Sequence, residues 1–75
     1  MILPPDPEGM NDKRAQWAQE AVTAFQRVTR ADDEDAVKDL LANLMHLCDR
    51  TGMEFAVQFD AALYMYREET DRLAA

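Results

Sequence analysis

The residues best suited to chemistry are two pairs of carboxylates, each spaced three residues apart. Asp32 and Asp35 form one pair, and Glu68 and Asp71 form the other. Residues three apart lie on the same side of a helix, and carboxylate oxygens are the ligands that Mg²⁺ prefers. Two such pairs on facing helices would suit a metal-dependent hydrolase.

This arrangement resembles the all-helical, magnesium-dependent nucleotide pyrophosphatases, and the resemblance implies nucleotide hydrolysis as a remote alternative. Simpler roles account for the same carboxylates. The acids at 32–35 fit a helix start, where capping and the helix dipole favour negative charge. Glu34 precedes Lys38, and Glu68 precedes Arg72, by the four residues that suit surface ion pairs. We therefore expect no metal site, no cofactor and no enzymatic activity.

His46 and Cys48 are the next candidates, and neither has a partner residue of its own type. One histidine and one cysteine cannot complete a four-ligand zinc site. The chain contains no serine to act as a nucleophile, and two glycines cannot build a glycine-rich phosphate loop. We expect His46 to face solvent and Cys48 to pack as a small apolar side chain.

Length and composition limit the chain to one small acidic domain. It has 75 residues, of which 48% are hydrophobic, and one cysteine, so an intrachain disulfide is excluded. The net charge of -7 disfavours direct binding to nucleic acid or to an anionic membrane surface. No apolar run is long enough to span a bilayer, and residues 1–9 lack the features of a signal peptide. The expected location is cytoplasmic.

The apolar pattern predicts an all-α fold, a small three-helix bundle with helices near 12–29, 33–50 and 54–72. Residues 1–10 hold all three prolines and are expected to form an extended arm, which leaves 11–75 as the helical domain. Asn11 or Asp12 is expected to cap the first helix and Asp32 or Asp33 the second, and Gly52 should end the second. The predicted core stripes of the three helices are Trp17, Ala18, Ala21, Ala24, Phe25 and Val28; Val37, Leu40, Leu41, Leu44, Leu47 and Cys48; and Phe55, Phe59, Ala62, Leu63, Tyr66, Thr70 and Leu73.

The third helix carries a second apolar face. Val57, Ala61 and Tyr64 lie on the side opposite Phe59, and Met65 flanks the core stripe. A chain of this size rarely gains more than about 3–5 kcal/mol from one core without a disulfide, a metal or an oligomer. The sequence therefore predicts a homo-oligomer, with a dimer favoured, whose interface residues are Val57, Ala61, Tyr64 and Met65.

Charge is distributed unevenly along the chain. Residues 11–31 carry a net charge of +2, residues 32–50 carry -4 and residues 51–75 carry -3. One interpretation is charge complementarity within the bundle, which contributes little per exposed pair. The other is an acidic face offered to a basic partner, as in an inhibitor of a host defence protein that imitates nucleic acid. That face would consist of Asp32, Asp33, Glu34, Asp35 and Asp39.

The stretch from Asp39 to Phe55, DLLANLMHLCDRTGMEF, resembles small acidic bacterial proteins of phage-like or conjugative elements. Those proteins have a leucine-rich helix ending in Met-His, an acidic residue, a glycine turn and a helix led by phenylalanine. The resemblance implies an accessory protein of a mobile element and no particular activity. The favoured function is therefore a small acidic protein-interaction module that self-associates and binds another, unknown protein.

Overall fold

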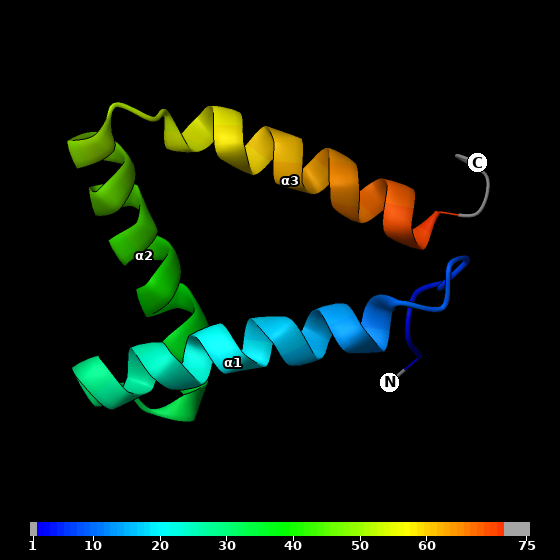
Figure 1. The fold of residues 1–75 in the computed structure, drawn as a ribbon, viewed down its shortest axis with the longest axis horizontal. Coiled ribbons are helices and arrows are strands. Elements are labelled where there is room, and N and C mark those ends of the chain that lie inside the picture. The colour runs from blue at the N-terminus through cyan, green and yellow to red at the C-terminus, as the bar shows by residue number, and fades with distance from the viewer. Residues whose placement is uncertain (1, 72–75) are drawn as a thin grey trace.

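The fold consists of three α-helices joined by two short connections (Figure 1). In the computed structural model, which describes residues 2–71, α1 covers Asn11–Thr29, α2 covers Asp33–Thr51 and α3 covers Phe55–Thr70. The structure shows α1 and α3 as two arms that run in opposite directions, with α2 crossing between them at one end.

The all-α prediction is confirmed, and the predicted helix bounds agree with the structure to within a residue or two. Residues 2–71 contain no strand. The third helix ends at Thr70, whereas the sequence analysis extended it to 72. Arg72 and the predicted core residue Leu73 lie outside the described residues.

Both connections begin with a residue in the left-handed conformation. Gly52 has a φ of 76°, as predicted, and its N–H donates to the carbonyl oxygen of Cys48. Arg30 has a φ of 64° and ends α1 in the same way, with its N–H donating to Gln26 at 2.8 Å. A residue with a Cβ is strained in this region, and glycine is not. Arg30 therefore terminates α1 at a conformational cost that Gly52 does not incur.

The helix starts differ from prediction in the groups that cap them. Asp32 stands at the predicted N-cap of α2, but its side chain makes no capping hydrogen bond. The N-cap of α1 is Met10, not Asn11 or Asp12 as expected. The N–H groups of Met10 and Asn11 instead donate to the Asp6 carboxylate, at 3.2 to 3.3 Å. A turn over residues 7–9, closed by the Gly9 N–H donating to the Asp6 carbonyl, allows this contact.

Helix α2 supplies the only fully buried residues among those described. Ala36 is 0% exposed and Cys48 is 6% exposed. Leu40 and Leu44 complete the row between them at intervals of four residues, which lies along one side of a helix. The expectation that Cys48 packs as an apolar residue is confirmed, and the buried Ala36 was not predicted.

Several residues predicted to lie in the core are exposed in the single chain. Trp17, Val28 and Val37 are 56%, 84% and 60% exposed. The half-buried apolar residues of α1 are Val22 and Phe25, so the packed side of α1 is rotated away from Trp17 toward Val22. Val22 was missed because four alanines and Trp17 dominate the apolar pattern of this helix, and small side chains do not mark a unique centre.

The chain is more open than a closed bundle of this size. Its radius of gyration is 14.3 Å, whereas about 11 Å is typical for 75 residues. Its accessible surface is 6429 Å², about 1,700 Å² above the value of about 4,700 Å² typical of a folded chain of 8.6 kDa. The exposed N-terminal segment and the separation of α1 from α3 both contribute to this excess.

Replacing Arg30 with glycine should stabilise the fold, because glycine adopts a positive φ without strain. We expect Arg30→Gly to raise the free energy of unfolding by about 0.5–1 kcal/mol in urea denaturation followed by circular dichroism. Arg30→Ala keeps the Cβ and removes the same charge, so it is the matched control and should not show the gain. Equal stability of the two variants would contradict a strained Arg30.

Enlarging the buried Ala36 should be costly because no space surrounds it. We expect Ala36→Leu to lower the free energy of unfolding by about 1–3 kcal/mol, as overpacking a tight contact does. Ala42→Leu makes the same change at an exposed position of α2 and should be close to neutral. Thermal unfolding of the two variants at equal protein concentration measures the difference, and similar midpoints would mean that the contact at Ala36 is loose.

Candidate functional site: an apolar opening closed by a polar clasp

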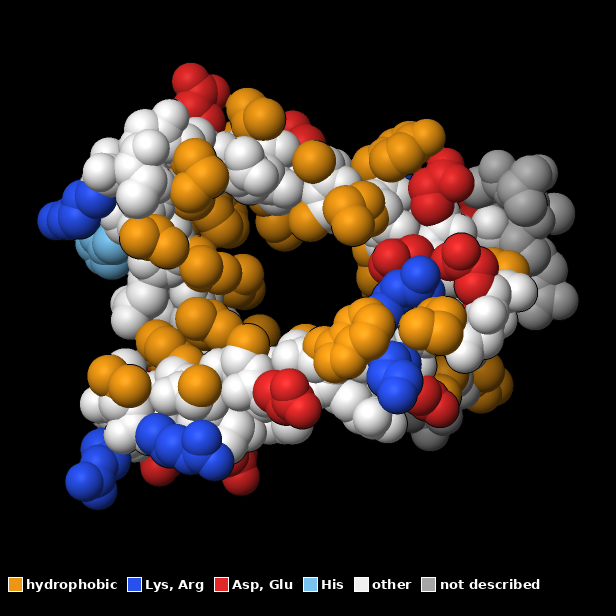
Figure 2. All heavy atoms as spheres, in the orientation of Figure 1, with side chains coloured by type: hydrophobic (Ala, Val, Ile, Leu, Met, Phe, Trp, Pro, Cys, Tyr) orange, Lys and Arg blue, Asp and Glu red, His pale blue; other side chains and the backbone are white. Residues whose placement is uncertain are grey.

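The most unusual feature of the molecule is an opening between α1 and α3 that passes through the molecule in the view of Figure 2. Apolar side chains gather around it, and the charged side chains lie mainly on the outer surface. Helix α2 bounds the opening at one end. Polar contacts between the start of α1 and the end of α3 bound it at the other. We call this space the apolar opening.

Helix α2 contributes the row that faces its two neighbours. Leu44 lies between Leu40 and the buried Cys48 in this row, yet Leu44 remains 37% exposed. The flanking residues Leu41 and Leu47 are 42% and 50% exposed. An isolated apolar residue on a surface is ordinary, but a continuous row on the packed side of a helix indicates a surface that is only partly covered.

Helix α3 contributes a second row, of larger side chains. Phe55 and Leu63 are half-buried, and Phe59 lies between them at intervals of four residues. The rings of Phe55 and Phe59 are stacked, with centroids 6.1 Å apart and an interplanar angle of 23°. Phe59 nevertheless remains 50% exposed, and Tyr66 on the same side is 53% exposed. Of the predicted stripe of α3, Phe55, Leu63 and Thr70 are thus half-buried, whereas Phe59, Ala62 and Tyr66 are exposed in the single chain.

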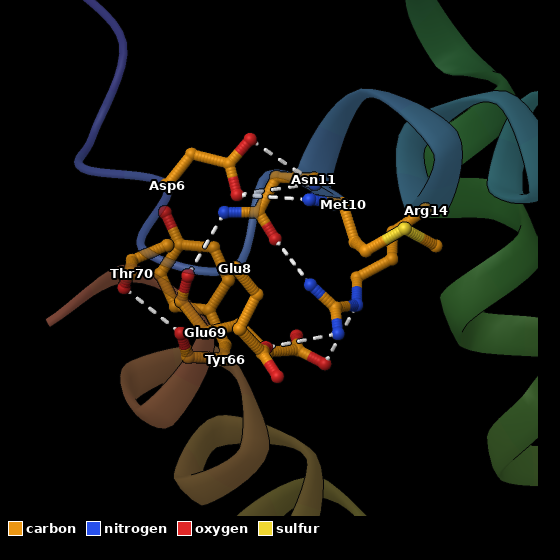
Figure 3. A network of polar contacts seen from close by, with 8 residues as sticks. All are labelled: Asp6, Glu8, Met10, Asn11, Arg14, Tyr66, Glu69 and Thr70. Atoms are coloured by element: carbon orange, nitrogen blue, oxygen red, sulfur yellow. Dashed lines mark hydrogen bonds and ion pairs between the residues drawn. The ribbon is translucent and has the colours of Figure 1, made fainter. Parts of the chain in front are cut away.

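A polar cluster closes the far end of the opening, and we call it the clasp: Glu8, Asn11, Arg14 and Glu69 (Figure 3). The Asn11 side-chain amide donates to the Glu69 carbonyl oxygen at 2.9 Å, and its oxygen accepts from Arg14 at 2.8 Å. The Arg14 guanidinium also pairs with the Glu69 and Glu8 carboxylates, at 3.0 and 3.1 Å. Arg14 thus joins the N-terminal segment, α1 and α3.

The clasp was not predicted from the sequence. Asn11 was considered only as a capping residue, and Arg14 only as part of the basic charge of the first helix. The side chains of Arg14 and Glu69 are 31% and 25% exposed, which is well covered for charged groups at a helix end. Their contact depends on the angle between α1 and α3, and no spacing within one helix contains that information.

A pocket of about 460 Å³ lies beside the clasp, between the N-terminal segment and the two helix ends. Leu3 and Pro4 line it on one side, with Ala15 and Ala18 of α1 and Tyr66 of α3 on the others. Its polar residues include the acids Asp6, Asp12 and Glu69. Most of its boundary is apolar, and the clasp residues Asn11, Arg14 and Glu69 supply part of its polar lining.

The predicted interface on α3 lies on the outer side of the helix and is exposed throughout. Val57, Tyr64 and Met65 are 56%, 66% and 59% exposed, and Ala61 between them is exposed too. A hydrogen bond with Glu68, together with the negative charge of Glu68, raises the pKa of the Tyr64 hydroxyl. The outer face of α3 is therefore a second apolar surface, separate from the apolar opening.

The predicted acidic face interacts partly with the chain itself. Asp33 accepts a hydrogen bond from Gln26 at 2.7 Å. Lys38 pairs with Asp35 and lies 3.8 Å from Asp39, instead of pairing with Glu34 as expected. These contacts, above all the hydrogen bond with Asp35, raise the pKa of Lys38. Asp32 and Glu34 remain exposed, so the five acids do not form a uniform unpaired surface.

Other candidate residues are not brought together in a catalytic arrangement within the described chain. His46 is exposed, as expected, and Cys48 is buried on the other side of α2. No three His, Cys, Asp or Glu side chains in residues 2–71 are grouped so that they could hold a metal ion. Asp71, the last described residue, and the acids at the start of α2 belong to no such group.

Comparison with known proteins gives no relative from which to transfer a function. The chain matches no protein-family model, no curated protein and no solved structure. In residues 2–71, the helices are all too short or too polar to cross a membrane. The function must therefore be argued from the surfaces described above.

Removing the clasp should loosen the two helix ends without affecting α2. Asn11→Ala deletes one donor and one acceptor, so we expect a loss of about 1 kcal/mol in the free energy of unfolding. Amide hydrogen exchange should accelerate in the first turn of α1 and the last turn of α3. Gln16→Ala removes an exposed amide from the same helix and serves as the control. Unchanged exchange at both helix ends would contradict the clasp.

Proposed function

We propose that this protein is a small acidic protein-interaction module that self-associates and acts by binding another protein chain. The observation that carries the proposal is the excess of exposed apolar surface on a chain with only two buried residues among those described. Surfaces of this kind on small proteins are typical of interfaces with other chains.

Two apolar surfaces are available for such contacts. One is the apolar opening, and the other is the outer face of α3 formed by Val57, Ala61, Tyr64 and Met65. A module with two distinct surfaces can associate with itself through one and offer the other to a different protein. The resemblance of residues 39–55 to proteins of phage-like or conjugative elements agrees with an accessory role of this kind.

The alternative function, imitation of nucleic acid by the acidic residues, has weaker support. Lys38 pairs with Asp35 and lies near Asp39, which offsets part of the charge that these two carboxylates offer to a basic partner. The two functions also respond differently to salt. Contacts between a basic channel and a phosphate mimic weaken as salt screens their attraction. Apolar contacts between two acidic chains do not weaken in this way.

Salt dependence of self-association is the test of this proposal. Each chain carries a net charge of -7, so two copies repel one another at low ionic strength. We expect sedimentation velocity to show a larger dimer fraction as sodium chloride rises from about 0.05 M to about 0.5 M, because the Debye length falls about threefold, from ~14 Å to ~4 Å. A monomer at high micromolar concentration across this whole range would rule the proposal out.

A charge variant provides the matched control for that experiment. Glu20→Gln with Glu34→Gln changes the net charge from -7 to -5 at two exposed positions. This double variant should self-associate more at low salt and respond less to added salt than the unchanged chain. An equal salt response in both chains would show that charge repulsion does not govern the association.

A further inference from the structure

The apolar opening is not covered by any part of the chain that the structure describes. Connections of three residues each, 30–32 and 52–54, hold α1 and α3 to α2 at one end. The clasp holds α1 to α3 at the other end, and Asp6 and Glu8 keep the N-terminal segment near the start of α1. In Figure 2, no segment of residues 2–71 lies across the opening. The described segments are held at both ends of the opening, so they cannot fill this space by a small adjustment.

The excess accessible surface of the chain is at least as large as the area that one partner buries in a stable interface. A standard protein interface buries about 800 Å² on each partner. The surface of this chain exceeds the value typical for its mass by about 1,700 Å², roughly twice that amount. The exposed apolar side chains around the opening, Leu44 and Phe59 among them, belong to this excess surface.

The small buried core indicates which kind of partner covers the opening. Only Ala36 and Cys48 are buried among the described residues, whereas side chains such as Leu44 and Phe59 remain 37% and 50% exposed on the packed sides of their helices. Folds of this size need an additional source of stability. A partner that completes the core must be present whenever the chain is present and at equal concentration. A second copy of the same chain meets both conditions.

We propose that a second copy of this chain covers the apolar opening, so that the two copies share one core in a two-fold dimer. This inference rests on the proposed self-association and adds which surface mediates it. The contacts then centre on Leu44 of α2 and Phe59 of α3. The outer face of α3, where the sequence analysis placed the interface, remains at the surface of the dimer.

Three single substitutions distinguish the two surfaces. Leu44→Glu places a charge in the opening, Ala42→Glu places it on the exposed side of the same helix, and Tyr64→Glu places it on the outer face of α3. By sedimentation velocity at high micromolar concentration, we expect Leu44→Glu to lose at least tenfold in dimer affinity. Ala42→Glu and Tyr64→Glu should change it by less than threefold. Loss of the dimer in Tyr64→Glu alone would overturn the inference but leave self-association standing, whereas a monomeric unchanged chain would remove both.

A measurement on the unchanged chain covers the case in which Leu44→Glu does not fold. A mixture of ¹³C-labelled and unlabelled protein gives isotope-filtered nuclear Overhauser contacts between the two copies only. We expect such contacts to join the methyl groups of Leu44 to aromatic protons of Phe55 or Phe59. Contacts between copies that involve only Val57, Ala61 and Tyr64 would place the interface on the outer face of α3 and overturn the inference.

Discussion

The rest of the structure depends on the packing of α1 and α3 against one row of side chains on α2. Ala36 is completely buried in this row, and its small side chain allows a close approach of helices. Cys48 is buried twelve residues further along, near the other end of α2. Because α1 and α3 pack near opposite ends of α2, they do not pack on each other along their lengths.

The clasp and the row on α2 differ in what they contribute. Hydrogen bonds and partly exposed ion pairs each add about 0.5–1.5 kcal/mol or less, since the same groups are solvated in the unfolded chain. The clasp therefore fixes the direction of the two arms more than it stabilises them. The favourable free energy of folding must come mainly from burial of apolar surface. In the described chain, much of the apolar surface around Leu44 and Phe59 remains exposed and does not contribute.

The sequence predicted the helices well because their signals are local. Gly52 marks the end of α2, Asp32 stands at its N-cap, and the three prolines keep the first ten residues out of the helices. The end of α1 had no such signal, because Arg30 adopts a conformation that usually belongs to glycine. Gly52 thus located the end of α2 through its backbone conformation, and Asp32 located the start of α2 although its side chain makes no capping hydrogen bond. The end of α1 was located only by the loss of apolar periodicity.

The candidate site was less accessible from the sequence, because it depends on angles between helices. A helical wheel assigns Trp17 and Phe25 to one stripe, but the angle at which α1 meets α2 decides that Phe25 is half-buried and Trp17 is not. The Asn11–Glu69 contact joins residues 58 positions apart and has no periodic signature. The second apolar face of α3 was visible in the sequence, whereas the apolar opening became visible only once α1 and α3 were seen to lie apart between α2 and the clasp.

The uneven charge limits the ways in which two copies can meet across the opening. The segment containing α1 carries +2, and the segments containing α2 and α3 carry -4 and -3. An arrangement that places α2 beside its own symmetry mate brings like charges together. An arrangement that places α1 of one copy near the acidic helices of the other brings opposite charges together. Charge adds little to affinity at exposed positions, but it discriminates between orientations that bury similar apolar area. Among arrangements of the proposed dimer that join Leu44 of one copy to Phe59 of the other, the charge pattern thus favours those that also bring α1 of each copy near the acidic helices of its mate.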